Sequence, residues 1–443
     1  SFSFPKECEF AGGRYFCQHG VNVAQSLTAF GVEHRLTGNP AGKDLAKKAV
    51  VRLDTCHGQL GGVWSAHEEL GGIEPNCGTE TCAVVETMNT VAELFSYFGD
   101  IEHLDRVEEA AFNRLPASYF NGSMWALTYF HQTNTFGGSC NQYGLPYECC
   151  VANGNQGWPK FISRLYARRA DGDLAAIMYA PSVLNTTLES NGATNQVHIT
   201  LDTKYPFSGG LHFTIDAQAA FKLWLRIPGW ADGAIVQFGR GASVPAPAGG
   251  FYPVDVLAGA TEVDLILPMD VRIKQEAAGG VSVHAGPLVF ALDLAPKEKV
   301  SKSCYLPPDG CGVDSIDPTE NWRTALILDK ADYKTGGLAV EWPNADQDLT
   351  DGGPFSSVAE FPRIRAVGAT LSDEAWPLAT CTSMESHCKD CVGPVPNLTS
   401  LYCERPIVTD RRPITLRPFG ATDVRIGIVP TMWYEGGASE VYV

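Results

Sequence analysis

The 443-residue sequence lacks long apolar segments and any excess of positive charge. Its longest apolar runs fall far short of the ~20 residues that a helix needs to cross a bilayer. It has 33 lysine and arginine residues against 50 aspartate and glutamate residues, which gives a net charge of −17. This acidic balance disfavours nucleic acids and anionic membranes as partners. We therefore expect neither a membrane span nor a nucleic-acid partner.

The sequence also lacks an initiating methionine, a signal-peptide pattern, internal repeats and low-complexity tracts. Because it begins at Ser1, we expect a mature or trimmed chain. Apolar residues make up 44% of the sequence and charged residues 19%, as in ordinary globular proteins. The length is sufficient for two or three domains with a large core.

Cysteine, in contrast, is abundant, with fourteen residues, and three glycosylation sequons begin at Asn121, Asn185 and Asn397. Together these features favour a secreted eukaryotic glycoprotein with disulfide bonds. An even number of cysteines follows residue 300, which allows up to three disulfide bonds with fifteen possible pairings. These cysteines are Cys304, Cys311, Cys381, Cys388, Cys391 and Cys403.

The pattern of apolar residues divides the chain into a helical part and β-type parts. Helical periodicity is found in the segments 22–38, 43–58, 81–99, 101–115 and 158–169, the last with Pro159 in its first turn. From about residue 169, short alternating segments between Gly, Pro, Asn and Asp predict a β-sandwich up to about residue 300. Residues 301–443 are turn-rich and read as a cysteine-rich β-type region. The expected fold class is therefore α+β with several domains.

Two short motifs bring glutamate and cysteine together. "GTETCAVV" contains Glu80 and Cys82, and "YECCVANG" contains Cys149 and Cys150. Three thiolates and one carboxylate form a suitable donor set for tetrahedral zinc, and bound metal protects thiols from disulfide exchange. The spacing is not that of a zinc finger, which has C-x-x-C pairs. A zinc site is therefore one interpretation of these motifs.

Disulfide bonding is the competing interpretation. Cys82, Cys149 and Cys150 also have Cys77 and Cys140 available as partners. In a chain with the composition of a secreted protein, this simpler chemistry is favoured when spacing alone is considered.

Four longer segments together resemble glycoside hydrolase family 127, whose founding activity is that of a β-L-arabinofuranosidase. They are "GTETCAVVETMNTVAELFSYFGD", "YECCVANGNQGWPKF", "LRIPGWA" and "AGPLVFAL". The resemblance runs to about residue 295 and implies an (α/α)6 catalytic barrel. Residues 1–168 are too few for twelve helices and are interpreted as the C-terminal half of that barrel. A segment upstream of Ser1, or a separately cleaved chain, is expected to complete it.

The odd number of remaining cysteines agrees with such a missing piece, to which one of them would be linked. They are Cys8, Cys17, Cys56, Cys77 and Cys140.

The resemblance also implies roles for individual residues. The zinc ligands would be Glu80, Cys82, Cys149 and Cys150. Cys149 would in addition be the nucleophile of a retaining glycosidase. The general acid/base would be Glu68 in "SAHEELGG", with the adjacent Glu69 as an alternative. A solvated charge at a helix end is the simpler interpretation of Glu68.

Sugar contacts implied by the resemblance are His19, Glu108 and Tyr129. Each has a plainer interpretation: a polar residue at a helix start, a solvated helix face and a core aromatic residue. Further pocket candidates are His57, His67 and His131, whereas Trp230 is assigned to the structure of the β domain.

Three functions follow from these interpretations. The first is a zinc-dependent retaining glycosidase that releases β-L-arabinofuranose or a related sugar from extracellular glycans or glycoproteins. The second is an inactive relative that serves as a structural or glycan-binding component of an extracellular assembly. The third is a disulfide-stapled lectin, which would have neither a free thiol nor a metal.

Overall fold

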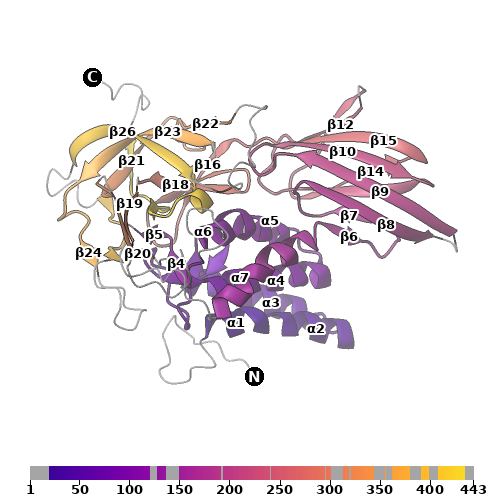
Figure 1. The fold of residues 1–443 in the computed structure, drawn as a ribbon, viewed down its shortest axis with the longest axis horizontal. Helices are drawn as coiled ribbons and strands as arrows, with labels where there is room; N and C mark the ends of the chain where they lie inside the picture. Colours follow the sequence, from indigo (N-terminus) through magenta and orange to yellow (C-terminus); the bar gives the residue numbers. More distant parts are fainter. Residues whose placement is uncertain are drawn as a thin grey trace.

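The computed structural model describes residues 19–119, 127–135, 149–190, 193–239, 241–294, 296–300, 313–318, 321–343, 355, 362–379, 391–398 and 408–434. Helices occupy the first part of the chain and strands the rest (Figure 1). In Figure 1 the helices lie below two groups of strands, a pink group on the right and an orange-to-yellow group on the left. The predicted order, helical first and β-type afterwards, is confirmed. No helix in the described residues has the length and apolarity that a membrane crossing requires.

The helical part has short connections and glycine at several helix ends. Its helices are α1 (Gly20–Ser26), α2 (Thr28–Thr37), α3 (Ala41–His57), α4 (Thr81–Phe98), α5 (Glu102–Glu109), the π-helix η2 (Ala110–Arg114), α6 (Leu115–Ala117) and α7 (Cys149–Ile162). α2 and α4 end at Gly38 and Gly99, whose φ values of 71° and 75° suit glycine. Most of α4 is buried, and α4 packs on α1, α2, α5 and α7. The arrangement of these helices as part of an (α/α)6 barrel stays a prediction.

Two of the predicted helices differ in the structure. Residues 22–38 are divided between α1 and α2, and the helix predicted over 158–169 ends at Ile162, before strand β6 (Tyr166–Arg168). α7 begins at Cys149 rather than at Trp158, so Pro159 lies inside the helix and not in its first turn. The pyrrolidine ring removes one backbone donor, yet the backbone N–H of Ser163 still donates to the carbonyl of Pro159 at 3.0 Å. Because α7 starts earlier, its first turn carries the two adjacent cysteines.

Among the described residues of the helical part, four short strands pair with one another. They are β1 (Gly58–Gln59), β2 (Val63–Trp64), β3 (Gly78–Glu80) and β4 (Phe130–Gln132). β1 pairs with β2, and β3 pairs with β4. The second pair is antiparallel, with Thr79 opposite His131 and Glu80 opposite Phe130.

Two sheets form the middle, pink part of the molecule (Figure 1). The first has the order β13-β12-β15-β10-β9-β8. Its strands are β8 (Ser182–Ser190), β9 (Ala193–Thr203), β10 (Gly210–Ala217), β12 (Ile235–Phe238), β13 (Ser243–Pro245) and β15 (Gly259–Ile266). The second has the order β14-β11-β7-β6. Its strands are β6 (Tyr166–Arg168), β7 (Leu174–Ala176), β11 (Phe221–Ile227) and β14 (Gly250–Val256).

The alternation that predicted a sandwich is visible in β10. Leu211, Phe213 and Ile215 are buried, whereas the residues between them are more exposed. Buried faces of this kind on both sheets supply one apolar core, as a period of two residues requires.

The remaining strands form a ten-stranded sheet with the main order β16-β17-β18-β26-β23-β21-β28. Its strands are β16 (Val271–Gln275), β17 (Val281–Ala285), β18 (Leu288–Asp293), β21 (Thr324–Asp329), β22 (Val340–Glu341), β23 (Arg363–Leu371), β26 (Val408–Pro418), β27 (Arg425–Ile426), β28 (Thr431–Tyr434) and β5 (Asn134–Thr135). The 3-10 helix η4 (Phe419–Ala421) follows β26. Separate pairs are β19 (Pro296–Val300) with β20 (Val313–Pro318), and β24 (Leu378–Ala379) with β25 (Cys391–Val392).

The change from the two middle sheets to the C-terminal sheet occurs at about residue 270. β16 to β18 join the C-terminal strands, so the predicted boundary at residue 300 does not coincide with the sheets. β5, which follows β4 of the helical part, also belongs to the C-terminal sheet through its pairing with β27. The side-chain oxygen of Asn134 accepts from the backbone N–H groups of Gly427 and Ile428, each at 2.9 Å. The helical part and the C-terminal sheet are therefore joined by shared strands.

Candidate active site

The beginnings of two helices meet at the cluster of glutamate and cysteine. Glu80 is the last residue of β3 and the N-cap residue of α4, and Cys82 lies in the first turn of α4. Cys149 and Cys150 are the first two residues of α7, which packs on α4. Helix beginnings carry partial positive charge and stabilise thiolates. The local sequence therefore places all four side chains where anionic ligands are favoured.

The four predicted ligands are close enough to share one metal ion. The Sγ atoms of the three cysteines and a carboxylate oxygen of Glu80 lie within 4.8 Å of one another. Cys82 Sγ and Cys150 Sγ are 3.2 Å apart, and Glu80 Oε1 is 3.3 Å from Cys150 Sγ. Cys149 Sγ lies 3.7 Å from the same Glu80 oxygen. The structure thus brings together residues up to 70 positions apart in the sequence.

The three thiols are free in the structure. Their environments differ, because Cys82 and Cys150 are 2% and 1% exposed whereas Cys149 is exposed. Burial raises the pKa of the Cys149 thiol to about 11, and Cys82 and Glu80 add to this effect. The pKa of Cys150 is raised mainly by its hydrogen bond with Cys82 and by burial. Burial also raises the pKa of Glu80. Without a cation, the cluster resists ionisation.

This donor set fits a soft divalent cation such as Zn²⁺. Three sulfur atoms and one carboxylate match the number and type of ligands of a tetrahedral zinc site. Glu80 Oε2 is buried and has no hydrogen-bond partner, which is unusual for a carboxylate oxygen. A cation would satisfy this oxygen and offset the mutual repulsion of the thiolates. The same thiols do not form the disulfide bonds that were the alternative interpretation.

Three further predicted residues adjoin the cluster on its exposed side. The hydroxyl of Tyr129 donates to Glu68 Oε1 and lies 3.9 Å from Cys149 Sγ. His19 Nε2 is 3.1 Å from Glu68 Oε2. Glu68 and not Glu69 therefore presents its carboxylate to Tyr129, next to Cys149. The side chain of Glu68 is 40% exposed, so a ligand from solvent has access to it.

Glu108, one of the predicted sugar contacts, lies in the interior of the protein. Its carboxylate is 0% exposed and forms an ion pair with Arg226 of β11. It also accepts from the backbone N–H of Tyr179 at 2.9 Å and from the hydroxyl of Tyr205 at 2.6 Å. Burial alone would lower the pKa of Arg226, but Glu108 and Asp105 outweigh it and raise that pKa. Glu108 therefore joins α5 to the middle part, a role that depends on partners distant in the sequence.

The remaining histidine candidates have lowered pKa values; His67 and His131 are buried, and His57 is partly buried. Burial lowers the pKa of His57 to about 4, with a further contribution from Arg52, and it lowers that of His67 to about 4. Burial, followed by two arginines, lowers the pKa of His131 well below 6.5. These residues are uncharged at neutral pH. Trp230 is partly buried against the core and lies 5.9 Å from the guanidinium of Arg272.

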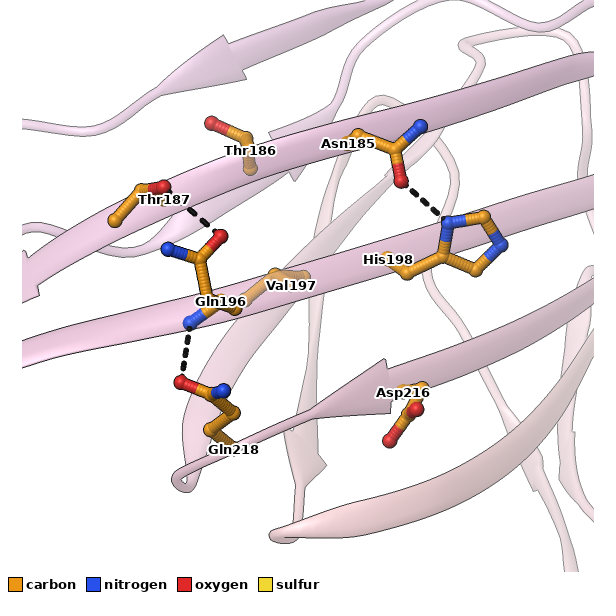
Figure 2. A pocket seen from close by; sticks show the side chains of 8 residues that line it. All are labelled: Asn185, Thr186, Thr187, Gln196, Val197, His198, Asp216 and Gln218. Carbon is orange, nitrogen blue, oxygen red and sulfur yellow. Dashed lines mark hydrogen bonds between the residues drawn. The ribbon is translucent and has the colours of Figure 1, made fainter.

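A hollow of about 330 Å³ lies far along the chain from these residues, on β8, β9 and β10 (Figure 2). Asn185 Oδ1 and His198 Nδ1 are 2.6 Å apart, and Gln218 accepts from the backbone N–H of Gln196. The side chains in Figure 2 are mostly polar and include no thiol. Asn185 and Asn397 are exposed, while Asn121 lies outside the described residues. Glycosylation at the three sequons stays a prediction.

The predicted disulfide bonds fall largely outside the described residues. Cys56 is disulfide-bonded. Outside the description lie Cys8, Cys17, Cys140, Cys304, Cys311, Cys381, Cys388 and Cys403.

Family models match both the helical part and the first sandwich. The catalytic-domain model of GH127 beta-L-arabinofuranosidase matches residues 33–163, and the middle-domain model matches residues 173–269. Together they cover about half of the chain and place it in the class of glycoside hydrolases. The chain belongs to glycoside hydrolase family 127. No curated protein sequence matches it.

Solved structures with the same fold are only distantly related in sequence. A GH127 beta-L-arabinofuranosidase from Geobacillus stearothermophilus T6 is 18% identical, with a TM-score of 0.62 over 94% of this chain and 60% of its own. A GH127 beta-arabinofuranosidase is 16% identical, with a TM-score of 0.64 over 94% of this chain and 61% of its own. A glycoside hydrolase, also 16% identical, has a TM-score of 0.65 over 94% and 66%. The chain thus spans less than two thirds of the length of these proteins.

Proposed function

We propose that the chain is a zinc-dependent retaining glycoside hydrolase that uses Cys149 as nucleophile and Glu68 as general acid/base. One observation carries the proposal: the hydroxyl of Tyr129 contacts both the exposed Cys149 sulfur and the Glu68 carboxylate. Because the Cys149 sulfur and the Glu68 carboxylate both contact the Tyr129 hydroxyl oxygen, their positions are compatible with the ~5–5.5 Å that separates nucleophile and acid/base in retaining enzymes. No other exposed thiol among the described residues has a carboxylate arranged in this way.

The residues of the chain divide the reaction between them. Glu68 protonates the glycosidic oxygen while the Cys149 sulfur attacks the anomeric carbon, so a C–S bond forms as the C–O bond breaks. Glu68 then removes a proton from water, which attacks the same carbon and releases the sugar and the thiolate. Tyr129 holds the Glu68 carboxylate toward the sulfur.

Glu80, Cys82, Cys149 and Cys150 would hold the metal. Bound Zn²⁺ would lower the pKa values of the coordinating thiols and fix the direction of the Cys149 sulfur. Glu80, Cys82 and Cys150 are buried and would keep solvent from the metal, while Cys149 is exposed and would be accessible to substrate.

The substrate proposed is β-L-arabinofuranose or a related sugar on extracellular glycans or glycoproteins. Support comes from the names of the matching family models and of two of the solved structures. We also propose that the protein is secreted, and that a further segment or chain completes the helical barrel. The second candidate is an inactive relative that retains the fold and binds glycans.

Hydrolysis of a chromogenic β-L-arabinofuranoside tests the proposal. We expect release by the zinc-loaded protein, at least a ~10³-fold lower kcat for Cys149→Ser, and loss on chelation that zinc reverses. Cys77→Ser is the matched control, because Cys77 is a buried cysteine that donates to the carbonyl of Gly71 outside the cluster.

Two results would contradict the proposal. Activity that persists in Cys149→Ser would exclude this sulfur as nucleophile. Absence of release from a zinc-loaded wild-type protein on a panel of pentofuranosides would favour the inactive relative.

A further inference from the structure

The antiparallel pair of β3 and β4 has a second buried face, opposite to the one that carries Glu80. Side chains alternate along a strand, and directly paired residues of antiparallel strands share a face. Thr79 and His131 form such a pair, next to the pair of Glu80 and Phe130. Thr79 is 0% exposed and His131 is 1% exposed. The cluster of Glu80 and the three cysteines and these two side chains therefore lie on opposite sides of the β3–β4 pair.

Arg114, at the end of η2, is bound close to this second face. It is 0% exposed, and its Nε donates to the carbonyl of Leu60 at 2.5 Å. Its Nη2 donates to the hydroxyl of Thr133, which directly follows β4. The third nitrogen, Nη1, is not used by either contact. The ring of His131 also lies near Arg114, because both side chains face the Phe419 ring, with centroid distances of 6.5 Å for His131 and 4.9 Å for the Arg114 guanidinium.

Three buried side chains at this place have polar atoms without a hydrogen-bond partner. Within the described part of the chain, these atoms are Thr79 Oγ1, both ring nitrogens of His131 and Arg114 Nη1. Of the two ring nitrogens of the neutral His131, one is a donor and the other an acceptor. The three side chains come from separate segments: β3, β4 and η2. Buried polar atoms without a partner are rare and costly, and several at one place indicate a missing acceptor.

The charges at this place have the same sign. The guanidinium carbons of Arg114 and Arg425 lie 4.9 and 4.6 Å from the centre of the Phe419 ring. Burial, and then Arg425, lower the pKa of Arg114 to about 9, and only Glu109 acts in the opposite direction. Glu109 also interacts with Lys274, so its charge is divided. Contact with an aromatic face offsets only part of the cost of burying a guanidinium.

We propose that a small monovalent anion, chloride in solution, binds between Thr79, His131 and Arg114. It accepts from the hydroxyl, from one imidazole N–H and from the guanidinium, and it balances the positive charge on this side of the β3–β4 pair. Water would accept the same bonds but would leave the charge uncompensated. Because the anion supports the strand that carries Glu80, its binding stabilises the folded protein, whether or not the chain is an enzyme.

Bromide provides the direct test. Crystals of the wild-type protein are soaked in sodium bromide, and anomalous differences are measured at the bromine absorption edge. We expect a peak within hydrogen-bond distance of Arg114 Nη1 and His131. A site with ordinary density but without an anomalous peak holds water, and this result would overturn the proposal.

Thermal unfolding provides an independent test in solution. We expect the melting temperature to rise saturably by ~2 °C as sodium chloride replaces sodium gluconate at constant ionic strength. Thr79→Val, which removes one donor and keeps the shape, should lose much of this rise. Thr90→Val is the matched control, because Thr90 in α4 is also 0% exposed with an unpartnered hydroxyl. Equal chloride dependence in wild type and both variants would contradict the proposed site, and bromide soaking remains decisive if Thr79→Val does not fold.

Discussion

Glu80 and Glu108 are both buried glutamates of the helical part, 1% and 0% exposed, yet their surroundings are opposite in kind. Glu108 is surrounded by donors: a guanidinium, a backbone N–H and a phenol hydroxyl. Glu80 is surrounded by thiols, and one of its oxygens has no partner. Burial alone therefore does not separate a structural carboxylate from a functional one. The difference lies in whether the protein itself supplies the compensating positive charge.

Removal of the charge of Glu108 tests the structural half of this comparison and has the largest expected effect. Glu108→Gln leaves Arg226 buried with one carboxylate fewer, so the free energy of unfolding should fall by about 3–5 kcal/mol. Urea unfolding followed by circular dichroism measures this change. The folded fraction should still bind one zinc ion per chain. A variant of unchanged stability would show that the ion pair with Arg226 contributes nothing net.

The same substitution at Glu80 tests the functional half. Glu80→Gln replaces a charged ligand by a neutral one, so zinc affinity should fall by at least ~100-fold. Competition with a chromophoric chelator measures the affinity, and the apo protein should be no less stable than apo wild type. If Glu80→Gln instead destabilised the apo protein as strongly as Glu108→Gln, the contrast between the two glutamates would fail.

The smallest expected effect concerns Tyr129, whose hydroxyl lies between Cys149 of the cluster and Glu68. Tyr129→Phe removes its hydrogen bond to the carboxylate and should lower kcat by ~10-fold, with zinc content unchanged. Tyr166→Phe is a suitable control, since the hydroxyl of Tyr166 contacts Ser182 at 3.3 Å in the middle part. A loss of zinc from Tyr129→Phe would assign this tyrosine to metal retention and not to the acid/base.

Sequence patterns predicted the cluster of Glu80 and the cysteines well, but they did not predict the environment of Glu108. Glu80 and the cysteine pair stand in short motifs, and the family resemblance linked these motifs across 70 positions. Glu108 lies on an amphipathic helix with the same local pattern as a solvated acid. Its partner Arg226 is 118 positions away on a strand, and nothing in either segment indicates the pairing. The alternation of β10 was visible in advance, whereas the assignment of β16 to β18 to the C-terminal sheet depends on long-range pairing.

The shared strand β5 has a consequence for the order in which the protein is made. β5 follows β4 after a single residue, and it pairs with β27, which lies almost 300 positions later in the sequence. At a synthesis rate of 5–20 residues per second, that partner leaves the ribosome about 15–60 s after β5. The strand pair that carries Glu80 therefore lacks this neighbouring support until β27 has emerged.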